Sequence, residues 1–218
     1  MWVVKLGGSL HDAPSLQAWL CRLVELPGPP RVVVPGGGPF ADAVRELQPR
    51  LGFGDLPAHR MAILAMQQYG LHLQALEPRL DLAETEAELL AARAAVWLPW
   101  RLAGRDATLP ASWDVTSDSL ACWLAVRLGA TALVLVKSAE TPAGSHAPEA
   151  LAAAGLLDPA FPGFVQDFAG TVLLAHRDRL PAALTLAGLG PACRVLPAHD
   201  ASFSSAGSDA SMIRRATR

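Results

Sequence analysis

Short apolar runs alternate with longer amphipathic segments along most of the chain. The runs span residues 2–6, 31–35, 131–137, 171–176 and 193–197, and residues 94–100 form a further candidate. They are rich in β-branched residues and leucine, and several are bounded by glycine or proline. Nearly continuous apolar runs of this kind are typical of strands that are covered on both faces, as in a parallel sheet.

Four segments between these runs have the helical spacing of apolar residues. They span residues 15–26, 39–51, 58–76 and 116–129. Pro39 suits the first turn of a helix, and Thr116 or Ser117 suits the N-cap of the last one, which Gly129 would terminate. Since strands and helices alternate, we expect an α/β fold, a three-layer α/β/α sandwich around a mainly parallel sheet.

The length of 218 residues fits one domain with a sizeable core. We assign residues 1–198 to this single domain. Residues 138–165 are rich in alanine, proline and glycine, and they predict a loop with one or two short helices. Residues 199–218 are polar and rich in small side chains, so we expect a C-terminal tail or docked arm.

Composition and charge narrow the classes of partner. The net charge is −2, from 18 basic and 20 acidic residues, which disfavours a nucleic-acid binder driven by a basic surface. No apolar stretch reaches the roughly 20 residues of a transmembrane helix, and the chain begins with a strand-like run rather than a signal peptide. We therefore expect a cytoplasmic protein without a nucleic-acid or membrane partner. Cys21, Cys122 and Cys193 lie far apart in apolar contexts and are expected to be buried thiols.

A glycine-rich loop follows the first predicted strand. Gly7 and Gly8 can expose backbone N–H groups to an anion, and Ser9 adds a hydroxyl. Lys5, at the end of the strand, supplies a positive charge, and the following helix N-terminus adds a favourable dipole. A tight strand-to-helix turn is the alternative explanation of the two glycines.

A second loop repeats this construction after the second predicted strand. Gly36, Gly37 and Gly38 are conformationally costly, so a turn alone rarely explains them. Two such loops at the same end of adjacent parallel strands would face each other across the usual ligand crevice of an open α/β sheet. Their spacing matches neither the dinucleotide pattern GxGxxG nor the P-loop pattern GxxxxGK[ST].

Two further charged positions complete the candidate site. Asp114 and Asp118 bracket the start of the helix at 116–129, and Lys137 ends the following strand. Asp118 and Lys137 each have an alternative, purely structural explanation. Asp118 in the first turn favours the helix dipole, and a lysine at the edge of a sheet can simply be solvated.

Together these segments resemble the amino acid kinase family. Its opening pattern is matched by "KLGGS" at 5–9, its second by "VPGGGPFA" at 34–41, and its aspartate-bearing helix by 118–130. The resemblance runs in order over residues 1 to about 140. Within the family, "VKLGGSL", "WDVTSDSLACWLA" and "LLDPAFP" are similar to the branch that phosphorylates (aminomethyl)furanmethanol phosphate in methanofuran biosynthesis.

The resemblance implies an ATP-dependent kinase that uses Mg²⁺ and transfers the γ-phosphoryl group to a phosphate monoester. The implied catalytic residues are Lys5 at the transferring group, Asp118 holding the catalytic lysine, and Lys137. The implied nucleotide-binding residues are Gly7, Gly8, Ser9, Lys137 and Ser138. The implied acceptor-binding residues are Gly36, Gly37, Gly38, Trp113 on the ring and Asp114 on the aminomethyl cation. No metal-ligand spacing is present, so Mg²⁺ would be held mainly by the phosphates of ATP.

The chain also departs from the family pattern. Many members carry a TDV-G turn where this chain has residues 137–141, "KSAET", and many carry a later lysine that is missing here. Lys137, Arg177 or Arg179 would then serve as the second cation. The alternative function is a non-catalytic member that binds a nucleotide or small anion as a sensor or store. The resemblance, together with the strongly apolar segment 58–76, further implies a homodimer.

Overall fold

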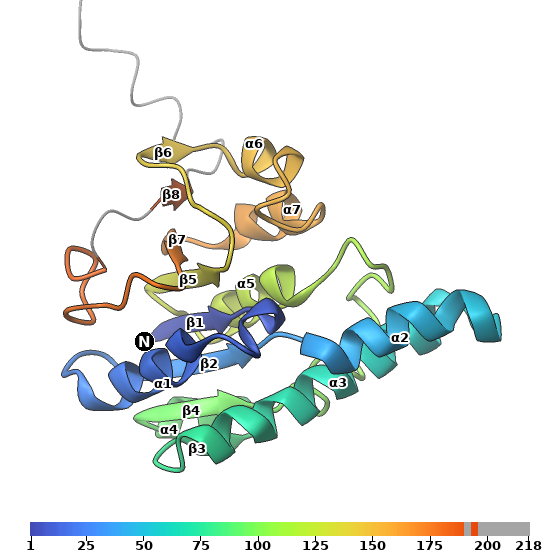
Figure 1. Cartoon of the computed structure of the whole chain (residues 1–218), viewed down its shortest axis with the longest axis horizontal. Helices are drawn as coiled ribbons and strands as arrows, with labels where there is room; N and C mark the ends of the chain where they lie inside the picture. Colours follow the sequence, from blue (N-terminus) through green and yellow to red (C-terminus); the bar gives the residue numbers. More distant parts are fainter. Residues whose placement is uncertain (190–192, 196–218) are drawn as a thin grey trace, which may run out of the picture.

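An eight-stranded sheet forms the centre of the molecule (Figure 1). The computed structural model describes residues 1–189 and 193–195, and the predicted tail at 199–218 lies outside them. The strand order is β3-β4-β2-β1-β5-β7-β8-β6, and the antiparallel pair is β7 with β8. The strands are β1 (Trp2–Leu6), β2 (Arg31–Pro35), β3 (Asp81–Ala83), β4 (Ala94–Trp97), β5 (Ala132–Lys137), β6 (Ser145–His146), β7 (Thr171–His176) and β8 (Cys193–Val195).

Helices connect the strands and cover the sheet. They are α1 (Pro14–Glu25), α2 (Gly38–Leu51), α3 (Asp55–Leu76), α4 (Glu86–Ala91), α5 (Ser117–Arg127), α6 (Pro148–Ala153) and α7 (Phe161–Phe164), with 3₁₀ turns at Gly8–Leu10 and Val165–Asp167. Gly129 follows the end of α5 with a φ of +57°, the left-handed conformation that glycine adopts without strain. No helix among the described residues is long and apolar enough to cross a membrane.

The α/β class and the mainly parallel sheet are confirmed, and each predicted strand and helix is present with small shifts of its ends. The segment 81–91 was not expected to contain β3 and α4. β3 has only three residues, and its first two are exposed, so it lacks the apolar run that marks the other strands. Cys122 and Cys193 are buried as predicted, but Cys21, which lies on α1 beside Glu77, is only half-buried.

Alternation along the strands divides the core into two layers. Val3 of β1 and Leu135 of β5 belong to the cluster that contains the buried residues of α5. Val4 and Val134, one position away, belong to the cluster on the opposite face, which contains the buried residues of α1. Since side chains alternate between the faces of a strand, the odd-numbered positions of β1 and β5 point towards α5. This rule also places the lysines at the ends of both strands.

The two glycine loops contact each other at one edge of the sheet. β1 and β2 pair in parallel up to Leu6 and Pro35, and the N–H of Gly36 donates to the carbonyl of Leu6 at 2.9 Å. A Cβ added to Gly8 would lie 2.2 Å from the backbone nitrogen of Gly38, and one added to Gly36 would lie 2.1 Å from that of Gly8. The prediction of a shared edge is confirmed, and the glycines are required because the two backbones touch.

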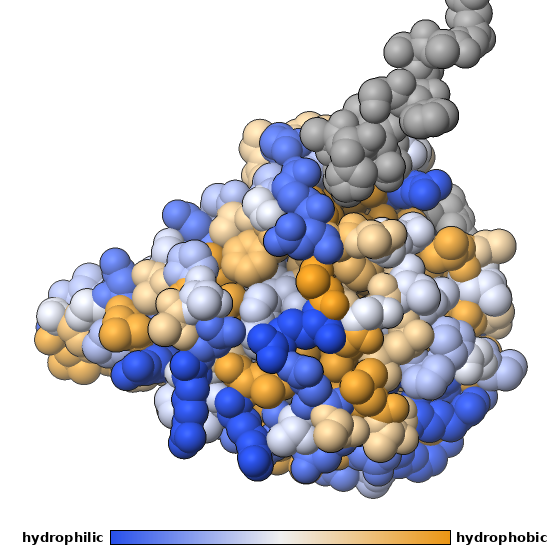
Figure 2. Space-filling view, turned by 180° about the vertical axis from the view of Figure 1, so that it is seen from behind, coloured by the Kyte–Doolittle hydropathy of each residue, from blue (hydrophilic) through white to orange (hydrophobic). Residues whose placement is uncertain are grey.

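The far end of α2 and the start of α3 project from the body of the molecule (Figure 1). Figure 2 shows the same projection from behind, with apolar and polar side chains mixed over that face. Leu51 and Leu56 lie on this projection and are exposed. The glycine loops lie at its base, because α2 begins at Gly38.

Candidate active site

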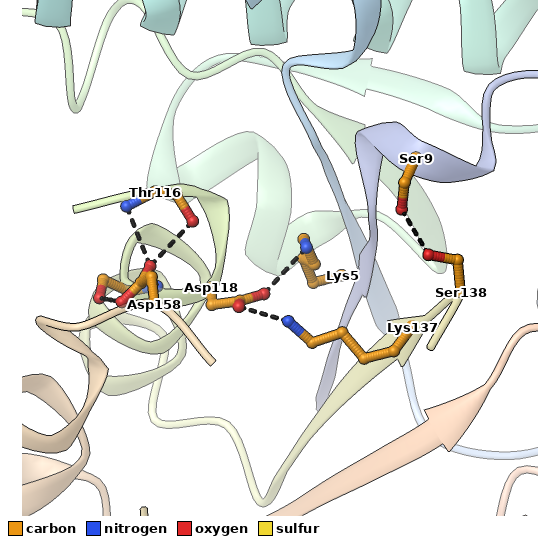
Figure 3. Close-up of polar contacts among 8 residues, drawn as sticks. Lys5, Ser9, Thr116, Asp118, Lys137, Ser138 and Asp158 are labelled. Carbon is orange, nitrogen blue, oxygen red and sulfur yellow. Dashed lines mark hydrogen bonds and ion pairs between the residues drawn. The ribbon is translucent and has the colours of Figure 1, made fainter. Parts of the chain in front are cut away.

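A buried carboxylate lies between two lysines at the carboxyl ends of neighbouring strands. The Nζ atom of Lys5 lies 2.9 Å from one carboxylate oxygen of Asp118, and Lys137 donates a hydrogen bond to the other (Figure 3). Asp118 is 3% exposed and Lys5 is 6% exposed. Lys5 is the penultimate residue of β1 and Lys137 ends β5, both at odd-numbered positions, so both side chains reach the first turn of α5.

These are the only two lysines in the sequence. All other cationic side chains among the 18 basic residues are arginines. Lysine carries a compact ammonium group on a flexible chain, whereas the guanidinium of arginine is a planar fork. The protein therefore has arginine at every other basic position, and both of its lysine ammonium groups contact the carboxylate of Asp118.

The charges at this centre do not cancel. Burial alone would raise the pKa of Asp118, but the two lysines outweigh it and lower the pKa to about 2. Burial and repulsion by Lys5 lower the pKa of Lys137 from 10.5, against the opposing effect of Asp118. With one carboxylate and two ammonium groups ionised, the centre carries one net positive charge in a region of low dielectric. Such a centre is suited to attract and stabilise a phosphate anion.

Two cavities meet beside the centre. The smaller one has a volume of 200 Å³ and is lined by Lys5, Gly7, Gly8, Ser9, Val136, Lys137, Ser138, Ala139, Gly155 and Leu156. The larger one has a volume of 730 Å³. Gly8, Ser9 and Ser138 line both cavities. The hydroxyls of Ser9 and Ser138 are 3.0 Å apart, so a hydroxyl pair lies at the boundary between the two cavities (Figure 3).

The larger cavity combines apolar walls with charged groups. Its larger apolar side chains are Ile63, Met66, Trp113, Val115 and Leu120, and its charged ones include Asp12, Asp42, Arg45 and Arg177. The indole N–H of Trp113 donates to Gln48 at 2.6 Å. The guanidinium of Arg45 lies 4.4 Å from the ring centre, within the range of a cation–π contact. These two contacts fix the ring against the cavity.

The structure brings most of the predicted site residues together. Lys5, Asp118 and Lys137 form the centre, and the predicted nucleotide-binding residues Gly7, Gly8, Ser9, Lys137 and Ser138 all line the smaller cavity. Of the predicted acceptor-binding residues, Gly37, Gly38 and Trp113 line the larger cavity. Gly36 is buried beneath the loop, where it contacts Gly8. Of the two alternative cations, Arg177 lines the larger cavity, but Arg179 lines neither.

Asp114 is the predicted acceptor-binding side chain that the structure does not bring to either cavity. Its side chain is exposed, and its backbone is fixed by hydrogen bonds with Ser112 and Ala160. The neighbouring residues Trp113 and Val115 do line the larger cavity. The carboxylates found there are instead Asp12 and Asp42. Their position shortly after each glycine loop was the signal that could have identified them.

The smaller cavity fits the polyphosphate of a nucleotide, because it offers two ammonium groups, two hydroxyls and the backbone of the first glycine loop. The nearby carboxylates are already engaged: Asp118 contacts both lysines, and Asp158 accepts hydrogen bonds from Thr116 and Ser119. No group of three potential metal ligands occurs within the described residues. A magnesium ion would therefore be held by phosphate oxygens and water rather than by a protein cage.

Comparison with known proteins decides the family. A model of the amino acid kinase family matches residues 1–140, which is more than half of the chain. The chain belongs to the amino acid kinase family. The matched region includes both glycine loops, Asp118 and Lys137, so the lysine–aspartate centre lies within the part that matches the family.

One curated relative is the (5-(aminomethyl)furan-3-yl)methyl phosphate kinase of Methanocaldococcus jannaschii. It is 30% identical over 131 residues, which are 57% of this chain and 59% of the relative, so the match spans about three fifths of that kinase's length. Two structures of amino acid kinase fold are also similar. Uridylate kinase of Archaeoglobus fulgidus has a TM-score of 0.59 at 15% identity, covering 78% of this chain and 88% of its own. Aspartate kinase of Synechocystis has a TM-score of 0.65 at 15% identity, and the match covers 89% of this chain and 39% of the aspartate kinase chain. Identities this low show the shared fold alone.

The Asp118→Asn variant tests the electrostatics of the centre. Asparagine leaves two buried ammonium groups without a counter-charge, so we expect a loss of about 3–5 kcal/mol in the free energy of unfolding at neutral pH. The pKa of Lys137 is lowered in the folded state, so the unfolded chain binds more protons as the pH approaches 10.5. Asp118 raises the pKa of Lys137, so its loss lowers this pKa further, and the folded variant binds fewer protons than the folded unmodified chain. The loss relative to the unmodified chain should therefore shrink as the pH rises towards that value.

Urea denaturation at neutral pH and near pH 10.5 measures this difference. Asp81→Asn is the matched control, because Asp81 is exposed on β3 and its loss should have little effect at either pH. An equal loss for Asp118→Asn at both pH values would contradict the electrostatic explanation.

Proposed function

We propose that this chain is an ATP-dependent kinase that transfers the γ-phosphoryl group to a phosphate monoester, with (aminomethyl)furanmethanol phosphate as the acceptor. The observation that carries the proposal is the buried Lys5–Asp118–Lys137 centre, which lies between two cavities at the glycine-rich edge of the sheet. Family membership and the name of the curated relative support the reaction class and the acceptor.

The protein's part in such a reaction is positioning and charge neutralisation. ATP, when bound, supplies the transferable phosphoryl group. Lys5 and Lys137 stabilise the negative charge on its oxygens, and Asp118 keeps both ammonium groups in place before the reaction starts. The hydroxyls of Ser9 and Ser138 donate to phosphate oxygens at the boundary between the cavities. Since the ammonium groups are already held, little reorganisation is needed during the transfer.

The second class of function is a non-catalytic nucleotide or anion binder. The altered segment 137–141 favours it, because residues that bind the base and ribose in many family members are replaced there. The position of Lys137 favours the kinase, because this lysine places a second ammonium group on the centre despite the absence of a later lysine.

Release of ADP tests the kinase proposal. The purified chain with ATP, Mg²⁺ and (aminomethyl)furanmethanol phosphate should release ADP in proportion to diphosphate product. We expect Lys5→Ala to lower kcat by about 10²–10³-fold, the range seen when one preorganised donor to a developing charge is removed. Arg22→Ala, an exposed change near the end of α1, is the control and should retain full activity.

If ATP shifts the melting temperature but no phosphate or carboxylate acceptor supports ADP release, the non-catalytic function is the correct one. Turnover with an acyl amino acid or a nucleoside monophosphate, but not with the furan compound, would retain the kinase and refute the proposed acceptor.

The larger cavity has the groups that this acceptor needs. Its phosphate would lie near Gly37 and Gly38, where α2 begins and its dipole favours an anion, with Arg177 on the same cavity. The apolar wall and the Trp113 ring suit a flat heteroaromatic body. Asp12 and Asp42 offer carboxylates for an ammonium group. We therefore assign the aminomethyl cation to this pair in place of Asp114.

Matched variants and a matched ligand test this assignment. We expect Asp12→Asn and Asp42→Asn each to raise KM for the aminomethyl acceptor about five- to tenfold, because each removes a charge-assisted hydrogen bond at an exposed site. KM for ATP should stay constant, and Asp114→Asn should resemble the unmodified enzyme. The analogue with methyl in place of aminomethyl separates charge from shape, since its KM should not respond to Asp12→Asn. If only Asp114→Asn raises KM for the aminomethyl acceptor, the aminomethyl cation binds to Asp114, as predicted from the sequence.

We also propose a homodimer that uses the outer face of α3. Met61, Leu64 and Leu71 are exposed and lie on one side of this helix at helical spacing. Light scattering at micromolar concentration should report twice the mass of 22.9 kDa, and the double variant Leu64→Asp, Leu71→Asp should report a monomer. A monomer for the unmodified chain would refute this proposal without affecting the kinase.

A further inference from the structure

Asp158 is a buried carboxylate that touches neither cavity. It is 6% exposed and lies between α6 and α7, in the segment "LLDPAFP". Its two oxygens accept four hydrogen bonds, from the backbone N–H and the hydroxyl of Thr116 and from those of Ser119, at 2.5 to 3.0 Å (Figure 3). All four donors belong to the first turn of α5 or to the residue before it.

This carboxylate caps α5 from a distant part of the chain. Thr116 occupies the N-cap position, where a side-chain oxygen normally accepts the N–H of the third helical residue, but its hydroxyl makes no such bond. That N–H belongs to Ser119, and it donates to Asp158 at 3.0 Å. The cap is therefore supplied by a residue 39 positions further along the chain.

The capped turn is the one that carries Asp118. Thr116 and Ser119 flank this residue on both sides, and Asp158 holds each of them by a backbone and a side-chain bond. An uncapped first turn frays, because its N–H groups lack partners. Fraying here would move the carboxylate that both lysines share. Gly155 and Leu156, which precede Asp158 in the same segment, line the smaller cavity. The segment that supplies the cap therefore also forms part of the wall of this cavity.

We propose that Asp158 is a positioning residue, which fixes the first turn of α5 so that Asp118 holds Lys5 and Lys137 together. It acts through the position of Asp118, it lines neither cavity, and its charge also raises the pKa of Lys137 directly. Its effect on turnover rests on the proposed kinase function, but its effect on the lysines does not.

The two lysines provide a direct readout. A chain labelled with ¹³C at lysine Cε should give two signals, one for each lysine. We expect Asp158→Ala to shift both signals, because the ammonium groups lose their fixed partner. The Asp158 charge also acts on Lys137 directly, so the signal of Lys5 is the cleaner readout. In the same variant kcat should fall about 10- to 100-fold, the cost of displacing a catalytic group by about an ångström. KM for ATP and for the acceptor should change by less than about threefold.

The control removes a helix cap elsewhere. Thr85→Ala abolishes the capping box of α4, which carries no residue of the site, and it should leave both lysine signals and kcat unchanged. Ser119→Ala is the milder variant: it keeps the carboxylate and both backbone bonds but removes the 2.5 Å hydroxyl bond. It should move the same signals in the same direction by a smaller amount, and it serves if Asp158→Ala does not fold.

The outcomes separate this inference from the kinase proposal. If Asp158→Ala shifts the lysine signals but the unmodified chain proves inactive, the positioning role is retained and the kinase is refuted. Unshifted signals and unchanged kcat in folded Asp158→Ala, or equal shifts in Thr85→Ala, would overturn the inference, since Asp158 would then only stabilise the fold.

Discussion

The arrangement of the site depends on one buried carboxylate shared by two ammonium groups. Removing three charges from water is costly, and the attraction between them offsets that cost only when their geometry is well fixed. Asp118 obtains this geometry from three elements: β1 and β5 present Lys5 and Lys137 on the same face, and α5 packs its first turn against them. The remaining positive charge is left for a ligand, so the free protein holds a partly compensated centre that an anion would complete.

The glycine loops satisfy a second constraint, which is the distance between two backbones. Gly8 and Gly36 leave no room for a Cβ, because the loops after β1 and β2 are in direct contact. This contact places the start of α2 beside the end of β1. The N-terminus of that helix and the lysine centre therefore lie at the same edge, and a phosphate can be approached from both.

Much of this site could be predicted because its signals are local. The loop glycines and Lys5 each follow an apolar run, and parallel strands bring such positions to one edge. Asp158 gave no comparable signal, because its partners at Thr116 and Ser119 lie far away in the sequence and the cap they form exists only after folding. The position of Asp114 outside both cavities could not be predicted for the same reason: sequence distance from Asp118 does not show which side of a turn a carboxylate faces. β3 could not be predicted, because it is a three-residue strand at the edge of the sheet and its first two residues are exposed, so it has no apolar run.

Both lysines of the protein lie in one buried centre. The rate at which a lysine-specific endoprotease cleaves the folded protein therefore measures how often the sheet opens locally around them. Cleavage requires an extended segment around the scissile bond, and Lys5 and Lys137 both lie at the ends of paired strands of the sheet. The folded chain should be cut only when β1 or β5 separates from its neighbours, whereas an arginine-specific enzyme finds exposed sites over the surface. The ratio of the two cleavage rates would therefore report how often this edge of the sheet opens, without any label or substrate.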